Sequence, residues 1–200
     1  MAVRTKELRI IAKPIYIDGV PLDMDLHATD AEFSHDPATV GCSLLSLRGA
    51  GAGQISIHAT MQALEQMARR KVTSTAAKQG LEVKSTRLQI TQPEPSDAKS
   101  LHFSLTIEAK MFVMVAALVI HGRMHLDDQL DLHLSELRCE GEGMTGSAAN
   151  AMLRPRFDAL EARPFSLKSL VPDSLAVRDV RIDTVDGLTA SAIFGSRASR

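Results

Sequence analysis

The sequence predicts an α+β fold, rich in antiparallel strands, within a single domain that spans residues 1–200. Three observations lead to this prediction. Apolar and polar residues alternate over many segments, which is typical of half-buried strands. Two other segments repeat apolar residues every three or four positions, as amphipathic helices do. Motifs from the first half of the chain return in the second half, which indicates an internal duplication.

The first half is expected to hold strands and one helix. Residues 20–28 alternate cleanly, and the preceding strand is expected to pair with them across Asp18-Gly19. The apolar stripe over residues 61–76 predicts a helix, which Gly80 would end. The strands expected around that helix cover residues 10–17, 20–28, 40–48, 53–57 and 81–90.

The second half repeats this composition. Residues 101–111 alternate most strongly of all, and the apolar run 111–120 is rich in β-branched residues. That run favours a strand covered on both faces, with a buried helix as the alternative. A three-residue turn at 127–129 would pair Met124 with Leu132. Further elements are expected at 130–139 (strand), 147–162 (helix, kinked or restarted at Pro155), and 175–183 with 188–194 (hairpin).

Two motifs recur between the halves. Residues Leu47, Arg48, Gly51 and Gly53 match Leu137, Arg138, Gly141 and Gly143, each pair separated by 90 residues. Residues 81–88 and 175–182 both fit the pattern L-x-V-[K/R]-x-x-R-[L/I]. We therefore expect two pseudo-repeats, about 1–91 and 98–195. Neither half alone has enough elements to bury both its sheet and its helix, so the halves are expected to pack together.

This layout of long alternating strands, one helix in each half and the final hairpin in residues 159–195 resembles the tubular lipid-binding (TULIP) superfamily, in particular its small bacterial members. The resemblance covers most of the chain. It implies curved antiparallel β-sheets wrapped around two helices, enclosing an apolar channel for lipid. The superfamily has no catalytic signature to carry over. Two departures are the absence of an export signal and the shortness of the predicted helices.

Composition excludes several classes of function. Lys and Arg total 23 against 24 Asp and Glu, so the chain lacks the basic surplus that a nucleic-acid partner requires. One Tyr and no Trp also leave few side chains for stacking on bases. The N-terminal residues contain no apolar signal sequence, which favours a cytoplasmic location. Without a secretion signal, Cys42 and Cys139 are expected to be reduced.

Four groups of residues could suggest chemistry, and each has a simpler interpretation. His121 and His125 lie on a predicted strand, where residues four apart are too far from each other to share a zinc ion. The glycines at 49, 51 and 53 lack the Lys-Ser/Thr of a phosphate-binding loop. Asp127-Asp128 fits a polar turn. The basic cluster 69–71 fits a solvated helix face, although it could touch a membrane surface. No catalytic residue, metal or cofactor is predicted.

We therefore expect a non-enzymatic protein that binds a lipid or another elongated apolar small molecule in an interior cavity. The nine Met residues favour this, since flexible thioether side chains adapt to varied apolar partners. The alternatives are a hot-dog-type acyl-thioester enzyme, which needs an inward carboxylate, and a scaffold or self-assembly module. No oligomeric state is predicted. The expected ligand-binding residues are Met61, Met67, Phe103, Met111, Met114, Met124, Met152 and Phe157.

Overall fold

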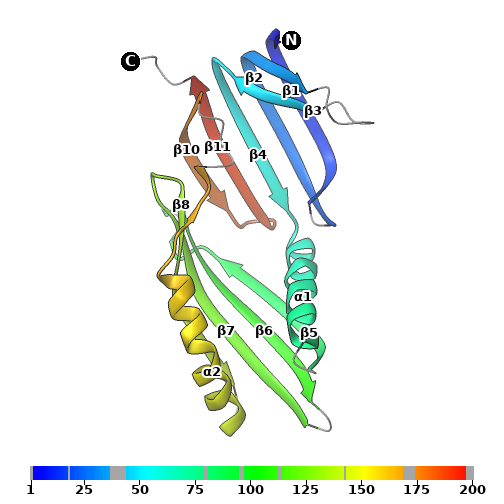
Figure 1. The fold of residues 1–200 in the computed structure, drawn as a ribbon, viewed down its shortest axis with the longest axis vertical. Coiled ribbons are helices and arrows are strands. Elements are labelled where there is room, and N and C mark those ends of the chain that lie inside the picture. Colours follow the sequence, from blue (N-terminus) through cyan, green and yellow to red (C-terminus); the bar gives the residue numbers. More distant parts are fainter. Residues whose placement is uncertain are drawn as a thin grey trace.

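The computed structural model describes residues 2–17, 19–36, 44–78, 81–94, 97–111, 114–141, 143–168 and 174–196. Within them the chain forms two helices and two antiparallel, curled sheets, so the α+β class is confirmed (Figure 1). The elements are β1 (Ala2–Ile17), β2 (Val20–Asp36), β3 (Leu44–Gly49), β4 (Ala52–Ala59), α1 (Met61–Ala77), β5 (Glu82–Thr91), β6 (Ser100–Met111), β7 (Met114–Leu126), β8 (Asp131–Gly141), α2 (Gly143–Glu161), β9 (Phe165–Ser166), β10 (Leu175–Asp183) and β11 (Leu188–Ser196).

Sheet A has the strand order β1-β2-β4-β11-β10, with β3 paired to the end of β2. It therefore joins the first strands of the chain to the last hairpin. The pairing of β11 with β4 links Ala192 to Ile55 and Phe194 to Gly53. In Figure 1, sheet A forms one end of the molecule, where both chain ends also lie.

Sheet B has the order β5-β6-β7-β8-β9 and lies at the other end of the molecule, together with both helices (Figure 1). Helix α1 packs mainly on β5, and α2 packs mainly on β8. The two helices thus lie over opposite ends of the strand order of sheet B, with β6 and β7 between them. This arrangement does not confirm the predicted wrapping of the sheets around the two helices.

Helix α1 begins at a clear sequence signal. The Thr60 side chain accepts a hydrogen bond from the Ala63 N–H at 3.2 Å, which caps the helix N-terminus. Leu64 and Ala76 of the predicted apolar stripe are buried, together with Ala63, whereas Met67 of the same stripe is 39% exposed. Arg70 donates to the Gly19 carbonyl at 3.0 Å and connects α1 to the β1–β2 turn.

Helix α2 is held on β8 through an irregular point of that strand. Glu136 has a positive φ of 56°, and the strand register shifts there, as in a β-bulge. The neighbouring Leu137 N–H donates to the Glu161 carboxylate at 2.6 Å, and Arg154 donates to the Leu137 carbonyl at 3.4 Å. Arg154 and Glu161 of α2 thus make polar contacts with the bulge, while Phe157 between them is buried.

The predicted elements are found, with corrections at their borders. The hairpin across residues 18–19 is confirmed, because Ile17 pairs with Val20. The hairpin of β10 and β11 is confirmed as well. The expected beginning of a strand at residue 40 and the Gly80 helix stop lie outside the described residues. Helix α2 begins at Gly143 rather than 147 and continues through Pro155.

Two predictions about β7 were wrong. The run 111–120 is not helical where the structure describes it, but it is not one strand either: β6 ends at Met111 and β7 begins at Met114, and these two residues pair. Val115 is exposed, so β7 is not covered on both faces. The turn after Leu126 lies one residue later than predicted, at 128–130, because the Asp127 N–H bonds to the Asp131 carbonyl; Met124 therefore pairs with Leu134 rather than Leu132. The physical reason is the Asp127 carboxylate, which accepts hydrogen bonds from the N–H groups of Gln129 and Asp131 and so fixes the turn at these residues.

Candidate functional site

One face of sheet A is apolar across all five of its main strands. The strand register lines up three rows of residues on this face, and none of their side chains is polar or charged. Most of them are only half-buried. The rows are Leu8–Ala28–Gly53–Phe194–Val177, Ile10–Leu26–Ile55–Ala192–Val180 and Ala12–Met24–Ile57–Ala190–Ile182.

The opposite face of sheet A is polar. Arg9 pairs with Asp25 at 3.2 Å, and His27 lies 3.3 Å from Glu7, both between β1 and β2. Farther along the sheet, His58 contacts Thr189 at 2.9 Å. Because alternate residues of a strand point to opposite sides, the contrast between the two faces is a direct product of the sequence alternation.

Sheet B has the same two-sided character, but helices cover part of its apolar face. The register aligns Leu88, Leu105, Ile120 and Cys139 in one row across β5 to β8. Phe157 and Leu153 of α2 pack on this face, against a cluster that also includes Leu137, Cys139 and Phe103. The residues between the two helices, such as Leu105 and Ile120, are only half-buried.

The open sheet faces agree with the accessible surface of the whole chain. The surface is 13222 Å², whereas a compact monomer of 21.7 kDa exposes about 9,200 Å². The excess of about 4,000 Å² is expected of a molecule whose sheets lack cover on one face. A soluble monomer normally hides such large continuous apolar surface, so a partner or ligand is the usual explanation.

The predicted ligand-binding residues fall into three groups. Phe103, Met124 and Phe157 lie on or against the apolar face of sheet B, and Met61 is half-buried at the start of α1. Met67 and Met152 are instead 39% and 60% exposed on the outer sides of their helices. The side chains of Met111 and Met114 lie outside the described residues. Among the six whose side chains the structure describes, Phe103 and Phe157 share one cluster, whereas Met67 and Met152 are exposed and lie outside it.

The sequence-based list missed sheet A. Its apolar face crosses five strands, but it has only one Met, Met24, at a paired position. The signal was present as alternation, since Leu22, Met24 and Leu26 stand on one side of the predicted strand. The list took Met and Phe residues from the predicted inward faces and included none of the residues of this strand.

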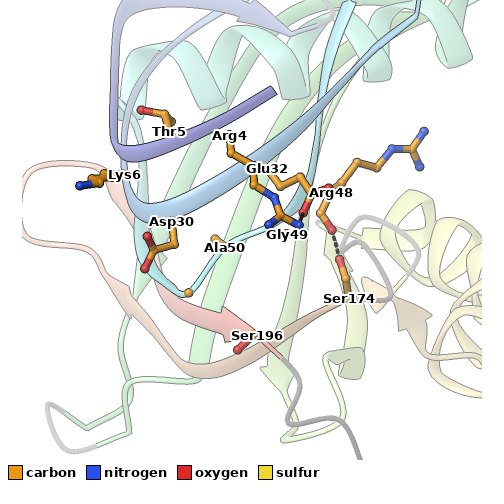
Figure 2. Close-up of a pocket in the computed structure, with 11 residues that line it drawn as sticks. Arg4, Thr5, Lys6, Asp30, Glu32, Arg48, Gly49, Ala50, Ser174 and Ser196 are labelled. Carbon is orange, nitrogen blue, oxygen red and sulfur yellow. Dashed lines mark hydrogen bonds and ion pairs between the residues drawn. The ribbon is translucent and has the colours of Figure 1, made fainter. Parts of the chain in front are cut away.

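Two hollows lined by described residues lie on polar surfaces. One has a volume of about 790 Å³ and is bordered by charged groups of β1 and β2, with Ser174 just before β10 and Ser196 at the end of β11 (Figure 2). There Arg4 pairs with Glu32 at 3.0 Å, so its cations are in part neutralised. A second hollow of about 490 Å³ lies on the polar face of sheet A. Neither is the apolar cavity that the sequence predicts, and that cavity stays a prediction.

A polar cluster around the buried Ser100 joins β6 and β7. Ser100 is fully buried, and its hydroxyl lies 2.9 Å from His125 Nδ1. Arg123 donates to the same hydroxyl at 3.4 Å and lies 3.6 Å from Asp97. A hydrogen bond from Ser100 lowers the pKa of Asp97. Because a substrate cannot reach the buried hydroxyl, this Ser, His and Asp grouping supports the fold rather than catalysis.

The remaining chemical groups stand apart from one another. Asp127 lies 3.0 Å from His133, and His121 lies 3.6 Å from Glu140. Within the described part of the chain, no three His, Cys, Asp or Glu side chains are placed to hold a metal ion. The Cys139 thiol is buried, and burial raises its pKa. Cys42 lies outside the described residues.

Comparison with protein-family models, with curated proteins and with solved structures found no match for this chain. No helix among the described residues is both long and apolar enough to cross a membrane. The candidate site therefore depends on the geometry of the apolar sheet faces alone.

Proposed function

We propose that this chain binds a lipid or another elongated apolar molecule along its apolar sheet faces, without catalysing a reaction. The observation that carries the proposal is the apolar face of sheet A. Three parallel rows of side chains cross five strands without a single charged or hydrogen-bonding side chain, and most remain partly open to solvent. An acyl chain fits such a surface because it buries apolar area and needs no hydrogen-bond partner.

We extend the proposal to the part of the apolar face of sheet B that lies between α1 and α2, as a second surface for the ligand. Its floor is formed by β6 and β7, where Leu105 and Ile120 are half-buried. The acyl-thioester alternative needs a carboxylate on an inward position. The paired apolar-face positions described for the two sheets hold none, so binding is favoured over this chemistry.

The proposal includes an internal duplication, which the strand order supports. The first half contributes β1, β2 and β4, with the short β3 beside β2, then α1, and then β5, which pairs with β6 of the second half. The second half contributes β6, β7 and β8, then α2, and later the β10–β11 hairpin, whose β11 pairs with β4 of the first half. One difference stands against strict equivalence. Gly51 and Gly53 lead into strand β4, whereas Gly141 and Gly143 lead directly into α2.

Two neighbouring isoleucines of β1 allow a matched test. Ile10 lies on the apolar face and Ile11 on the polar face, with exposures of 39% and 53%. Because both are exposed, Ile10→Glu and Ile11→Glu should leave the fold intact. We expect Ile10→Glu to weaken binding of a fluorescent fatty-acid probe about tenfold or more, since a carboxylate would lose hydration against the ligand. Ile11→Glu should bind the probe like the wild type.

Native mass spectrometry of the protein purified from its own host gives a second, independent readout. Co-purified lipid in the wild type, reduced in Ile10→Glu, is the expected result. No bound lipid, no probe binding and equal behaviour of the two variants would refute the proposal and favour a scaffold protein.

A further inference from the structure

The first strand of the chain has an unpaired edge that is unusually long. β1 is a 16-residue strand at the end of sheet A, and within the described residues only β2 pairs with it. The edge strand of sheet B after β8 is, by contrast, only 2 residues long. Natural proteins usually keep edge strands short or covered, because their free N–H and C=O groups recruit other strands.

Exposed apolar side chains gather on this same strand. Val3, Ile10, Ile11 and Tyr16 of β1 are 39% to 69% exposed. They lie on both faces of the sheet, so a single apolar ligand on one face would not cover them all. A strand added alongside β1 would approach residues on both faces.

We propose that β1 pairs with β1 of a second copy of this chain, antiparallel and centred on Leu8. A two-fold axis perpendicular to the sheet would keep the apolar faces of both copies on the same side. Under that symmetry, Glu7 of each copy stands opposite Arg9 of the other. The contact thus contains two opposite-charge pairs, one on each side of Leu8.

The charges select this register over its neighbours that keep the same faces aligned. A centre on Glu7 would place two Glu7 side chains opposite each other, and a centre on Arg9 would do the same with two arginines. Like charges directly opposite destabilise a strand pair. A centre on Ile10 would need regular pairing beyond Ala12, where the β1 register shifts.

The charges within each copy fit the same register. Arg9 already pairs with Asp25, and Glu7 with His27, on the polar face. Joining two copies would place Arg9 of one copy, which pairs with its own Asp25, beside Glu7 of the other, which pairs with its own His27. The apolar face of sheet A in one copy would also become continuous with that of sheet A in the other copy. The inference does not depend on a ligand, because the strand pairing itself stabilises the contact.

Sedimentation velocity over a range of concentrations, without ligand, tests the contact. We expect the wild type to form dimers. Glu7→Arg and Arg9→Glu should each raise the dimer dissociation constant about tenfold or more, because each creates two like-charge pairs. The Glu7→Arg/Arg9→Glu double variant should dimerise again, because the opposite charges are restored with exchanged positions.

Mixing the two single variants gives the sharpest result. Glu7→Arg chains carry two arginines and Arg9→Glu chains carry two glutamates at these positions, so the mixture should form heterodimers that native mass spectrometry resolves by mass. Arg181→Glu, on strand β10 at the opposite edge of sheet A, is the control and should dimerise like the wild type. Thermal melts establish that each variant is folded.

A wild type that stays monomeric would overturn the proposal. So would single variants that dimerise as strongly as the wild type, or folded double variants and mixtures that do not recover. The fatty-acid probe experiment is independent of these outcomes, so failure of the dimer contact and failure of ligand binding are distinguishable.

Discussion

Sheet A and sheet B are built on the same alternation of apolar and polar residues, yet they differ in what covers them. Sheet B carries α1 on β5 and α2 on β8, both on its apolar face. Sheet A carries no helix along its rows; α1 meets β2 near the β1–β2 turn, where Arg70 contacts Gly19. The apolar surface of sheet A therefore has no described helix over it outside the cluster around Ala28 and Phe194, while that of sheet B is open only between its helices.

This difference in cover distinguishes apolar residues that stabilise the fold from apolar residues that remain open to a ligand. On sheet B, much of the apolar face stabilises the fold by packing against helices. On sheet A, a small cluster around Ala28, Ala31 and Phe194 closes one end, and the other rows have no described element over them. Similar sequence patterns thus give a core in one place and an available surface in the other, because the covering elements differ.

The largest expected effect on stability comes from loosening α2, which covers part of the apolar face of sheet B. Phe157 of α2 is buried against Leu137 and Cys139. Phe157→Ala should lower the free energy of unfolding by about 3–5 kcal/mol, since it removes a large side chain from a packed contact. Leu160→Ala on the same helix, where the side chain is 39% exposed, should have a much smaller effect. Urea unfolding measures both, and equal losses would mean that α2 is not anchored through Phe157.

A pair of glycines sharpens the contrast at sheet A. A Cβ at Gly53 would collide with the Phe194 ring and lie 2.8 Å from the His27 carbonyl, whereas one at Gly49 would meet nothing within 4 Å. Gly53→Ala should therefore cost about 1–3 kcal/mol of stability by overpacking. Gly49→Ala should change it by about 0.5 kcal/mol or less. Thermal or urea unfolding of the two variants tests whether Phe194 truly closes that end of the sheet.

Much of the fold followed from the sequence, because strands and helices leave local periodicities. The alternation around Met24 and Leu26 and the final hairpin identified their strands directly. The division into two sheets was not predictable, since alternation gives the buried side of a strand but not its neighbour. Nothing near Ile55 or Ala192 in the sequence shows that β4 pairs with β11. The candidate surface depends on that non-local pairing, which explains why residue-type reasoning selected Met67 and Met152 instead.

The position of the turn after Leu126 could not be predicted from the alternation of apolar and polar residues either. The register after Leu126 is shifted because one carboxylate, Asp127, accepts two backbone N–H groups and also lies 3.0 Å from His133. These interactions favour the ionised form and lower the pKa of Asp127 from 3.8 to about 2. The first cause is the backbone hydrogen bond from Asp131, and the hydrogen bond with His133 follows it.

The smallest expected effect tests this turn, which fixes the register of sheet B. Because the pKa of Asp127 is lower in the folded state, its ionisation contributes stability above about pH 4, and that contribution is lost as pH falls toward 2. Asp127→Asn keeps a side-chain oxygen that can accept the backbone hydrogen bonds but removes the charge. The variant should be slightly less stable than the wild type near pH 6, and the two melting temperatures should converge between pH 4 and 2. A constant difference over this range would mean that the charge of Asp127 does not hold the turn, and that the register of β7 and β8 is set by apolar pairs such as Leu126 with Leu132.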